Sequence, residues 1–120
     1  MKKKYLSLIA VTFILAASAA DAAPRSFTGF WNTNWGSLQM TQKGSQVMGH
    51  YAGQFKGIID GTVAGNRLHF TWSQPNGEHG KGYFILSEDG NSLDGAWGMN
   101  ESESNGGSWT GTRVTGGDTN

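Results

Sequence analysis

Apolar and polar residues alternate in short runs between residues 27 and 114, and each run ends at a turn that contains glycine. The most regular run includes Leu68, Phe70 and Trp72, which alternate with polar residues. Successive side chains of a β-strand point to opposite faces, so this period of two predicts strands with one apolar face. We expect eight strands, at residues 27–31, 37–41, 47–51, 58–63, 68–73, 83–87, 93–99 and 108–114, with loops at 74–80 and 101–107.

Short sequential strands joined by tight turns can form an open sheet, a sandwich or an up-and-down barrel. We expect the barrel, because a closed sheet leaves no edge strand exposed to aggregation. The predicted fold class is therefore all-β, an antiparallel up-and-down meander closed into a small eight-stranded barrel. The interior of such a barrel is either filled by side chains or just able to hold one small ligand. A barrel in the outer membrane is disfavoured, since spanning strands need about 9–11 residues and most of these runs are shorter.

The first 22 residues have the pattern of a secretory signal peptide. Lys2, Lys3 and Lys4 form a positively charged start, residues 5–17 are mostly apolar, and Ala20-Asp21-Ala22 resembles a cleavage site. A membrane anchor is the alternative, but a spanning helix needs about 20 apolar residues. We expect cleavage after Ala22, a secreted or periplasmic protein with no membrane span after cleavage, and a single barrel domain at residues 23–120 in which residues 115–120 form a tail.

The composition agrees with one all-β domain, because 19 of the 120 residues are glycine, five are tryptophan and only 15% are charged. Without residues 1–22 the chain has six basic and eight acidic residues, a formal charge of −2 without charged runs. We therefore expect no nucleic-acid partner. The chain has no cysteine, so about 98 residues must be held by packing alone, and a homo-oligomer would bury further apolar surface.

Patterns for catalysis and metal binding are missing from the sequence. It has no cysteine nucleophile, no Gly-x-Ser-x-Gly elbow and no pair of carboxylates at a recognisable spacing. His50, His69 and His79 lack the spacing of metal ligands, so we expect them at the surface. We therefore expect a protein that is not an enzyme and that holds neither a metal nor a cofactor.

The order of several short motifs resembles the avidin and streptavidin family of biotin-binding barrels, over nearly the whole of residues 23–120. The motifs are Thr28-Gly29-x-Trp31, Gly36-Ser37, Gly49-x-Tyr51, Phe70-Thr71-Trp72, the interval from Phe84 to Trp97, and Trp109-x-x-Thr112-Arg113-Val114. The resemblance implies an avidin-like barrel that binds a small ligand, with biotin the leading candidate. It also implies self-association, because avidins are dimers and tetramers.

The resemblance further implies a set of ligand-binding residues. Ser37 and Tyr51 match the hydroxyl groups that hydrogen-bond the ureido oxygen of biotin, and Trp72, Trp97 and Trp109 match the tryptophans that enclose the ligand. A neutral, flat ligand suits aromatic walls with a few fixed hydroxyl groups. In the run 37–41, however, Leu38 and Met40 alternate against Ser37, so an inward Ser37 would also turn Gln39 and Thr41 into the barrel.

A second function class stays open beside the ligand-binding one. The barrel could be solid, with its outer face serving a structural or protein-interaction role in the cell envelope or extracellular matrix. For Trp72 and Trp97, packing in the barrel core is the alternative to a ligand wall. The free volume inside the barrel distinguishes the two functions.

Overall fold

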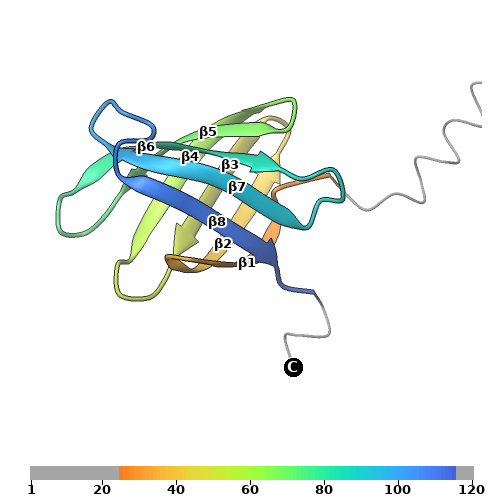
Figure 1. Ribbon diagram of the computed structural model, residues 1–120, viewed down its shortest axis with the longest axis horizontal. Helices are drawn as coiled ribbons and strands as arrows, with labels where there is room; N and C mark the ends of the chain where they lie inside the picture. Colours follow the sequence, from red (N-terminus) through yellow and green to blue (C-terminus); the bar gives the residue numbers. More distant parts are fainter. Residues whose placement is uncertain (1–24, 116–120) are drawn as a thin grey trace, which may run out of the picture.

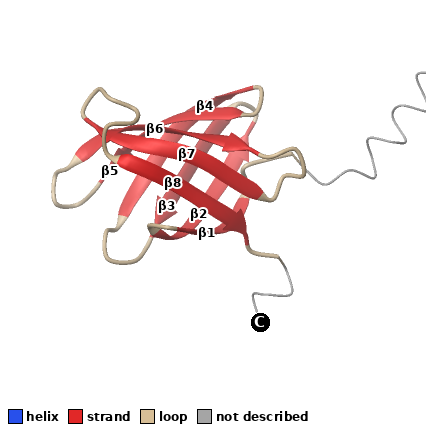
Figure 2. Ribbon diagram, in the orientation of Figure 1, coloured by secondary structure: helices blue, strands red, loops and turns tan. Residues whose placement is uncertain are grey.

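The fold is a closed β-barrel, seen in a computed structural model that describes residues 25–115 (Figure 1). Each strand pairs antiparallel with the next, and the last pairs with the first. The strands are β1 (Gly29–Thr33), β2 (Gly36–Lys43), β3 (Gln46–Tyr51), β4 (Gly57–Ala64), β5 (Arg67–Ser73), β6 (His79–Leu86), β7 (Ser92–Met99) and β8 (Gly107–Arg113). The predicted all-β meander barrel is confirmed, and the described chain contains no helix (Figure 2).

Two sequence predictions fall outside the described residues. The expected signal peptide at residues 1–22 is one, and residues 116–120 of the expected tail are the other. Between residues 25 and 115, no helix is long and apolar enough to cross a membrane.

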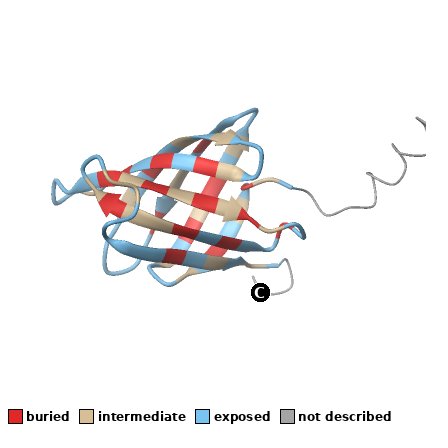
Figure 3. Ribbon diagram, turned by 45° about the horizontal axis from the view of Figure 1, so that its top comes forward, coloured by how far each residue is buried: buried red, intermediate tan, exposed pale blue. Residues whose placement is uncertain are grey.

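Burial alternates along the strands as the sequence predicts (Figure 3). On β5, the side chains of Leu68, Phe70 and Trp72 are buried, and the residues between them are exposed. Burial of each such side chain contributes roughly 1.5–3 kcal/mol to folding. One cluster of buried hydrophobic side chains forms the core: Phe27, Trp31, Leu38, Met40, Val47, Tyr51, Ile59, Leu68, Phe70, Trp72, Phe84, Leu86, Leu93 and Trp109.

The beginning of β6 differs from the sequence prediction. Residues 74–80 are predicted as a loop, but the strand already begins at His79. Gly82 occupies an inward position opposite Phe70, and a Cβ atom there would lie 2.5 Å from Cζ of that ring. Glycine leaves room for the ring and at the same time removes the apolar side chain that an alternation would show. The first half of β6 therefore shows no hydrophobic periodicity, and the sequence predicted only the second half of the strand.

Aromatic rings fill the middle of the barrel. The ring centroids of Phe70 and Phe84 are 5.0 Å apart, and Trp109 lies 5.2 Å from Phe84 and 5.5 Å from Phe70. Tyr51 continues the stack at 5.2 Å from Trp109. These separations are typical of rings in contact. Free space for a ligand is therefore restricted to the ends of the barrel.

Candidate functional site

The candidate site is a cavity at one end of the barrel. Connections between antiparallel strands leave the barrel at alternate ends, so those that follow β1, β3, β5 and β7 meet at the same end (Figure 1). A cavity of about 140 Å³ opens between them. It is lined by Trp35, Tyr51, Phe55, Trp72, Gln74, Glu78, Trp97, Met99 and Trp109.

Four of the five residues predicted to bind a ligand line this cavity. Tyr51, Trp72, Trp97 and Trp109 come from β3, β5, β7 and β8, and their side chains point into the barrel. Trp72 and Trp97 meet with their ring centroids 5.8 Å apart and their planes at 82°. Tyr51 and Trp109 meet at 86°. The rings therefore form walls that stand nearly perpendicular to one another.

Ser37, the fifth predicted residue, does not line the cavity. Leu38 and Met40 are buried on β2, which places Ser37 on the outer face of the barrel, where it is exposed. Leu38 is the residue that pairs with Tyr51 across β2 and β3. The position inferred from the family pattern therefore conflicts with the alternation of the strand, and burial of the two apolar side chains decides the face.

Trp35 and Phe55 form one side of the cavity mouth. Their ring centroids are 6.1 Å apart, and Trp35 also contacts Trp97 at 5.6 Å with the planes at 90°. Both residues lie in connections between strands, and both are partly exposed. Sequence reasoning did not include them in the site. The alternation of connections between the two barrel ends is the signal that would have placed them there.

Three of the four indole N–H groups around the cavity are bound by the protein itself. Trp72 donates to the carbonyl of Gly98 at 3.0 Å, and Trp35 donates to the carbonyl of Ser108 at 3.1 Å. Trp109 donates to Oγ1 of Thr33 at 3.1 Å. The fourth N–H, on Trp97, is buried and has no partner within residues 25–115. The three bonds fix the orientation of the rings and leave mainly aromatic carbon to face a ligand.

The connection between β5 and β6 supplies the polar groups of the cavity. The backbone N–H of Gln74 donates to the carbonyl of Glu78 at 3.0 Å, which closes a tight loop and brings both side chains to the mouth. The amide nitrogen of Gln74 also donates to the Tyr51 hydroxyl at 2.9 Å. Burial raises the pKa of Tyr51, so its hydroxyl stays protonated at neutral pH and can donate to a ligand.

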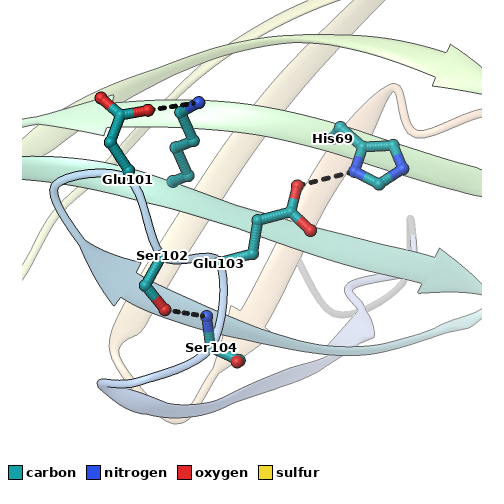
Figure 4. A network of polar contacts seen from close by, with 6 residues as sticks. His69, Glu101, Ser102, Glu103 and Ser104 are labelled. Carbon is teal, nitrogen blue, oxygen red and sulfur yellow. Dashed lines mark hydrogen bonds and ion pairs between the residues drawn. The ribbon is translucent and has the colours of Figure 1, made fainter.

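The loop between β7 and β8, residues 100–106, is tied to the outer face of the barrel (Figure 4). Nδ1 of His69 on β5 lies 2.8 Å from a carboxylate oxygen of Glu103. Nζ of Lys81 on β6 lies 2.8 Å from a carboxylate oxygen of Glu101. The two acidic residues of this loop therefore have cationic or polar partners outside the cavity.

The described residues contain no metal site, and the hollow at the opposite end of the barrel has fewer aromatic side chains. Within residues 25–115, no three His, Cys, Asp or Glu side chains lie close enough to hold a metal ion. His50, His69 and His79 are exposed, as predicted. A second hollow, of about 400 Å³, lies at the other end of the barrel, and Phe27 is the only aromatic residue among those that line it.

Comparison of the chain with protein-family models, curated proteins and solved structures finds no match in any of the three. The closed barrel of eight antiparallel strands is compatible with an avidin-like fold. The fold is therefore established by the strand pairing, and the avidin relationship rests on the sequence motifs alone.

Proposed function

We propose that the chain is a binding protein of avidin-like form that takes a small organic ligand into the aromatic cavity. The main support for this proposal is the cavity, which is surrounded by six aromatic side chains at one end of the barrel. Concave sites with apolar and aromatic walls and a few polar groups are the usual form of small-molecule sites. One carboxylate and no histidine line the cavity, which favours binding over catalysis.

The volume of the cavity restricts the ligand. Pockets for drug-sized ligands have about 300–1,000 Å³, whereas this cavity has about 140 Å³. A dry protein cavity of about 150 Å³ takes up benzene. The cavity therefore suits one ring or one branched group, and the rest of a longer ligand would extend past Trp35 and Phe55.

Biotin is the ligand that the resemblance implies. Tyr51 is in the cavity, where its hydroxyl could donate to a ureido oxygen. Ser37 lies outside and cannot supply the second hydroxyl. The carboxylate of biotin would also meet Glu78, a like charge at the mouth. We therefore expect biotin to bind more weakly than an uncharged ligand that fills the same space.

Tryptophan fluorescence and thermal melting test the binding proposal. The probes are biotin and 3,3-dimethyl-1-butanol, called dimethylbutanol below, which is a small neutral alcohol that ends in a tert-butyl group. A ligand that binds only the folded state stabilises it by about 2.7 kcal/mol at a hundredfold excess over Kd. We expect saturable fluorescence quenching and a higher melting temperature with dimethylbutanol, and smaller changes with biotin. If both probes and a cationic probe of the same size leave both signals unchanged, the cavity is not a ligand site.

Export is part of the same proposal and rests on the charged, apolar and small-residue segments at the start of the sequence. The protein recovered from the periplasm or the medium should begin near Ala23. N-terminal sequencing checks this expectation. Exported material that still begins at Met1 would contradict the signal peptide.

A second candidate function is that of a structural or interaction module. The filled middle of the barrel favours it, as do three apolar side chains on the outer face: Phe30, Met48 and Ile58 are 55%, 59% and 54% exposed. Phe30 and Ile58 lie on one cross-strand row, linked through Gln39 and His50. We propose a second copy of this chain as the partner for this outer face.

A further inference from the structure

The charge of the cavity narrows the class of ligand. Glu78 is the only charged residue in the lining, which contains no lysine, arginine or histidine. Within residues 25–115, its carboxylate makes no hydrogen bond and no ion pair, whereas Glu101 and Glu103 at the same end have Lys81 and His69 as partners. Glu78 is exposed to solvent, and its negative charge at the mouth of an aromatic cavity favours a cationic ligand over an anionic one.

The aromatic walls favour the same charge. The faces of aromatic rings carry negative potential, and a cation within about 6 Å of a ring centroid is attracted to it. Trp72 and Trp97 stand at 82° to each other, and Trp35 and Trp97 at 90°. All three of these tryptophans line the cavity, so a cation bound there lies beside several aromatic rings. Because three indole N–H groups are bound by the protein, the walls offer few donors to an anion.

The small number of polar groups selects among cations. A primary ammonium has three N–H donors that need acceptors. The Glu78 carboxylate can accept from such a group, but the other polar groups of the lining, the Tyr51 hydroxyl and the Gln74 amide, are hydrogen-bonded to each other. A quaternary ammonium group has no N–H donor, is covered by methyl groups and is compact enough for a cavity of about 140 Å³. Methyl groups against aromatic carbon also bury apolar surface, which adds to the attraction of the charge.

We propose that the cavity recognises a quaternary or fully methylated ammonium group, with the tryptophan rings around the methyl groups and Glu78 opposite the positive charge. This inference rests on the proposed ligand-binding function of the same cavity. In this inference the aromatic side chains bind the cation, and the carboxylate of Glu78 repels anions.

Choline and dimethylbutanol test the inference as a matched pair, because dimethylbutanol has a carbon atom where choline has its charged nitrogen. Titration of the full chain, followed by tryptophan fluorescence, gives the two dissociation constants. We expect choline to bind at least about tenfold more tightly. Equal affinities, or tighter binding of dimethylbutanol, would overturn the cation inference and leave the small-ligand site intact. If neither compound binds, the proposed ligand-binding function is overturned with it.

Replacement of the carboxylate provides the second test. Glu78→Gln keeps the shape of the side chain and removes its charge, so it should weaken choline binding several-fold and leave dimethylbutanol binding unchanged. Glu88→Gln is the matched control, because Glu88 is an exposed residue in the connection between β6 and β7 at the opposite end. A choline affinity that Glu78→Gln leaves unchanged would show that the carboxylate takes no part in recognition.

Discussion

The guanidinium group of Arg113 stacks on the ring of Trp31, with its central carbon 4.3 Å from the ring centroid. The same group donates to the carbonyls of Thr28 at 2.6 Å, Ser26 at 2.7 Å and Gly90 at 2.9 Å. These bonds join β8 to the segment that precedes β1 and to the connection between β6 and β7. Arg113 therefore closes the end of the barrel opposite the cavity.

Arg113→Lys should destabilise the protein by about 1–3 kcal/mol, because one ammonium group cannot reproduce the stacking and the fork of hydrogen bonds. Urea unfolding measures the change. Arg67→Lys is the control, since Arg67 also stacks on a ring, that of Tyr83 at 4.2 Å, but on the outer surface. It should cost less than about 1 kcal/mol. Equal losses in the two variants would contradict the closing role of Arg113.

Alternation of side chains is what made most of the barrel predictable. In β5, Leu68, Phe70 and Trp72 each bury a large side chain, so the period of two appears directly in the sequence. The first half of β6 has glycine at its inward positions, and Gly82 yields its space to Phe70. The first half of β6 therefore depends on a contact between residues of two different strands. A pattern within one stretch of sequence does not show such a contact.

The candidate site was predictable to the extent that its residues lie on strands. Trp72 could be placed inside the barrel from the alternation, whereas Trp35 and Phe55 belong to connections without a period. Their meeting depends on which end of the barrel each connection reaches. The number of strands that precede a connection gives its end of the barrel, and the sequence predicted that number.

Loop 100–106 should loosen at both acidic and strongly alkaline pH. The hydrogen bond from Lys81 lowers the pKa of Glu101, and the same bond raises the pKa of Lys81. The contribution of Glu101 is present above the ordinary pKa of glutamate and is lost as the pH falls through its lowered pKa. The contribution of Lys81 is present below the ordinary pKa of lysine and is lost as the pH rises through its raised pKa.

Amide hydrogen exchange of residues 100–106 measures this effect, with the intrinsic pH dependence of exchange subtracted. Protection should be highest at pH values between the pKa of Glu101 and the pKa of Lys81, and it should fall at lower and at higher pH. Lys81→Gln should reduce protection within that window, while Lys43→Gln, at an exposed lysine at the end of β2, should not. If the protection of these amides changes neither with pH nor in the Lys81→Gln variant, the loop is held by its other contacts.

Self-association through the outer face should depend on its apolar side chains. Ile58 is 54% exposed on β4, and Ile58→Lys would place a charge in a contact between two copies. We expect light scattering to show a dimer or larger assembly at micromolar concentration, and Ile58→Lys to shift it toward the monomer. Thr62→Lys, at an exposed outward position farther along β4, is the control. A monomer in the unchanged protein would remove the proposed partner.

Two substitutions in the cavity should separate the site from the scaffold. Tyr51→Phe removes one hydroxyl and keeps the ring, so it should weaken biotin binding by about 1–2 kcal/mol and change the stability little. Trp72→Ala should damage both binding and folding, with a loss of about 3–5 kcal/mol in stability, because a large buried ring is removed. Fluorescence titration and urea unfolding measure the two effects separately.

Tyr83→Phe is the control for the hydroxyl, because Tyr83 lies on the outer face of β6, where Arg67 stacks on its ring. It should leave biotin binding unchanged. A Tyr51→Phe variant that binds biotin as well as the unchanged protein would mean that the hydroxyl does not face the ligand. If the unchanged protein shows no response to saturating biotin, the resemblance to avidin concerns the fold only.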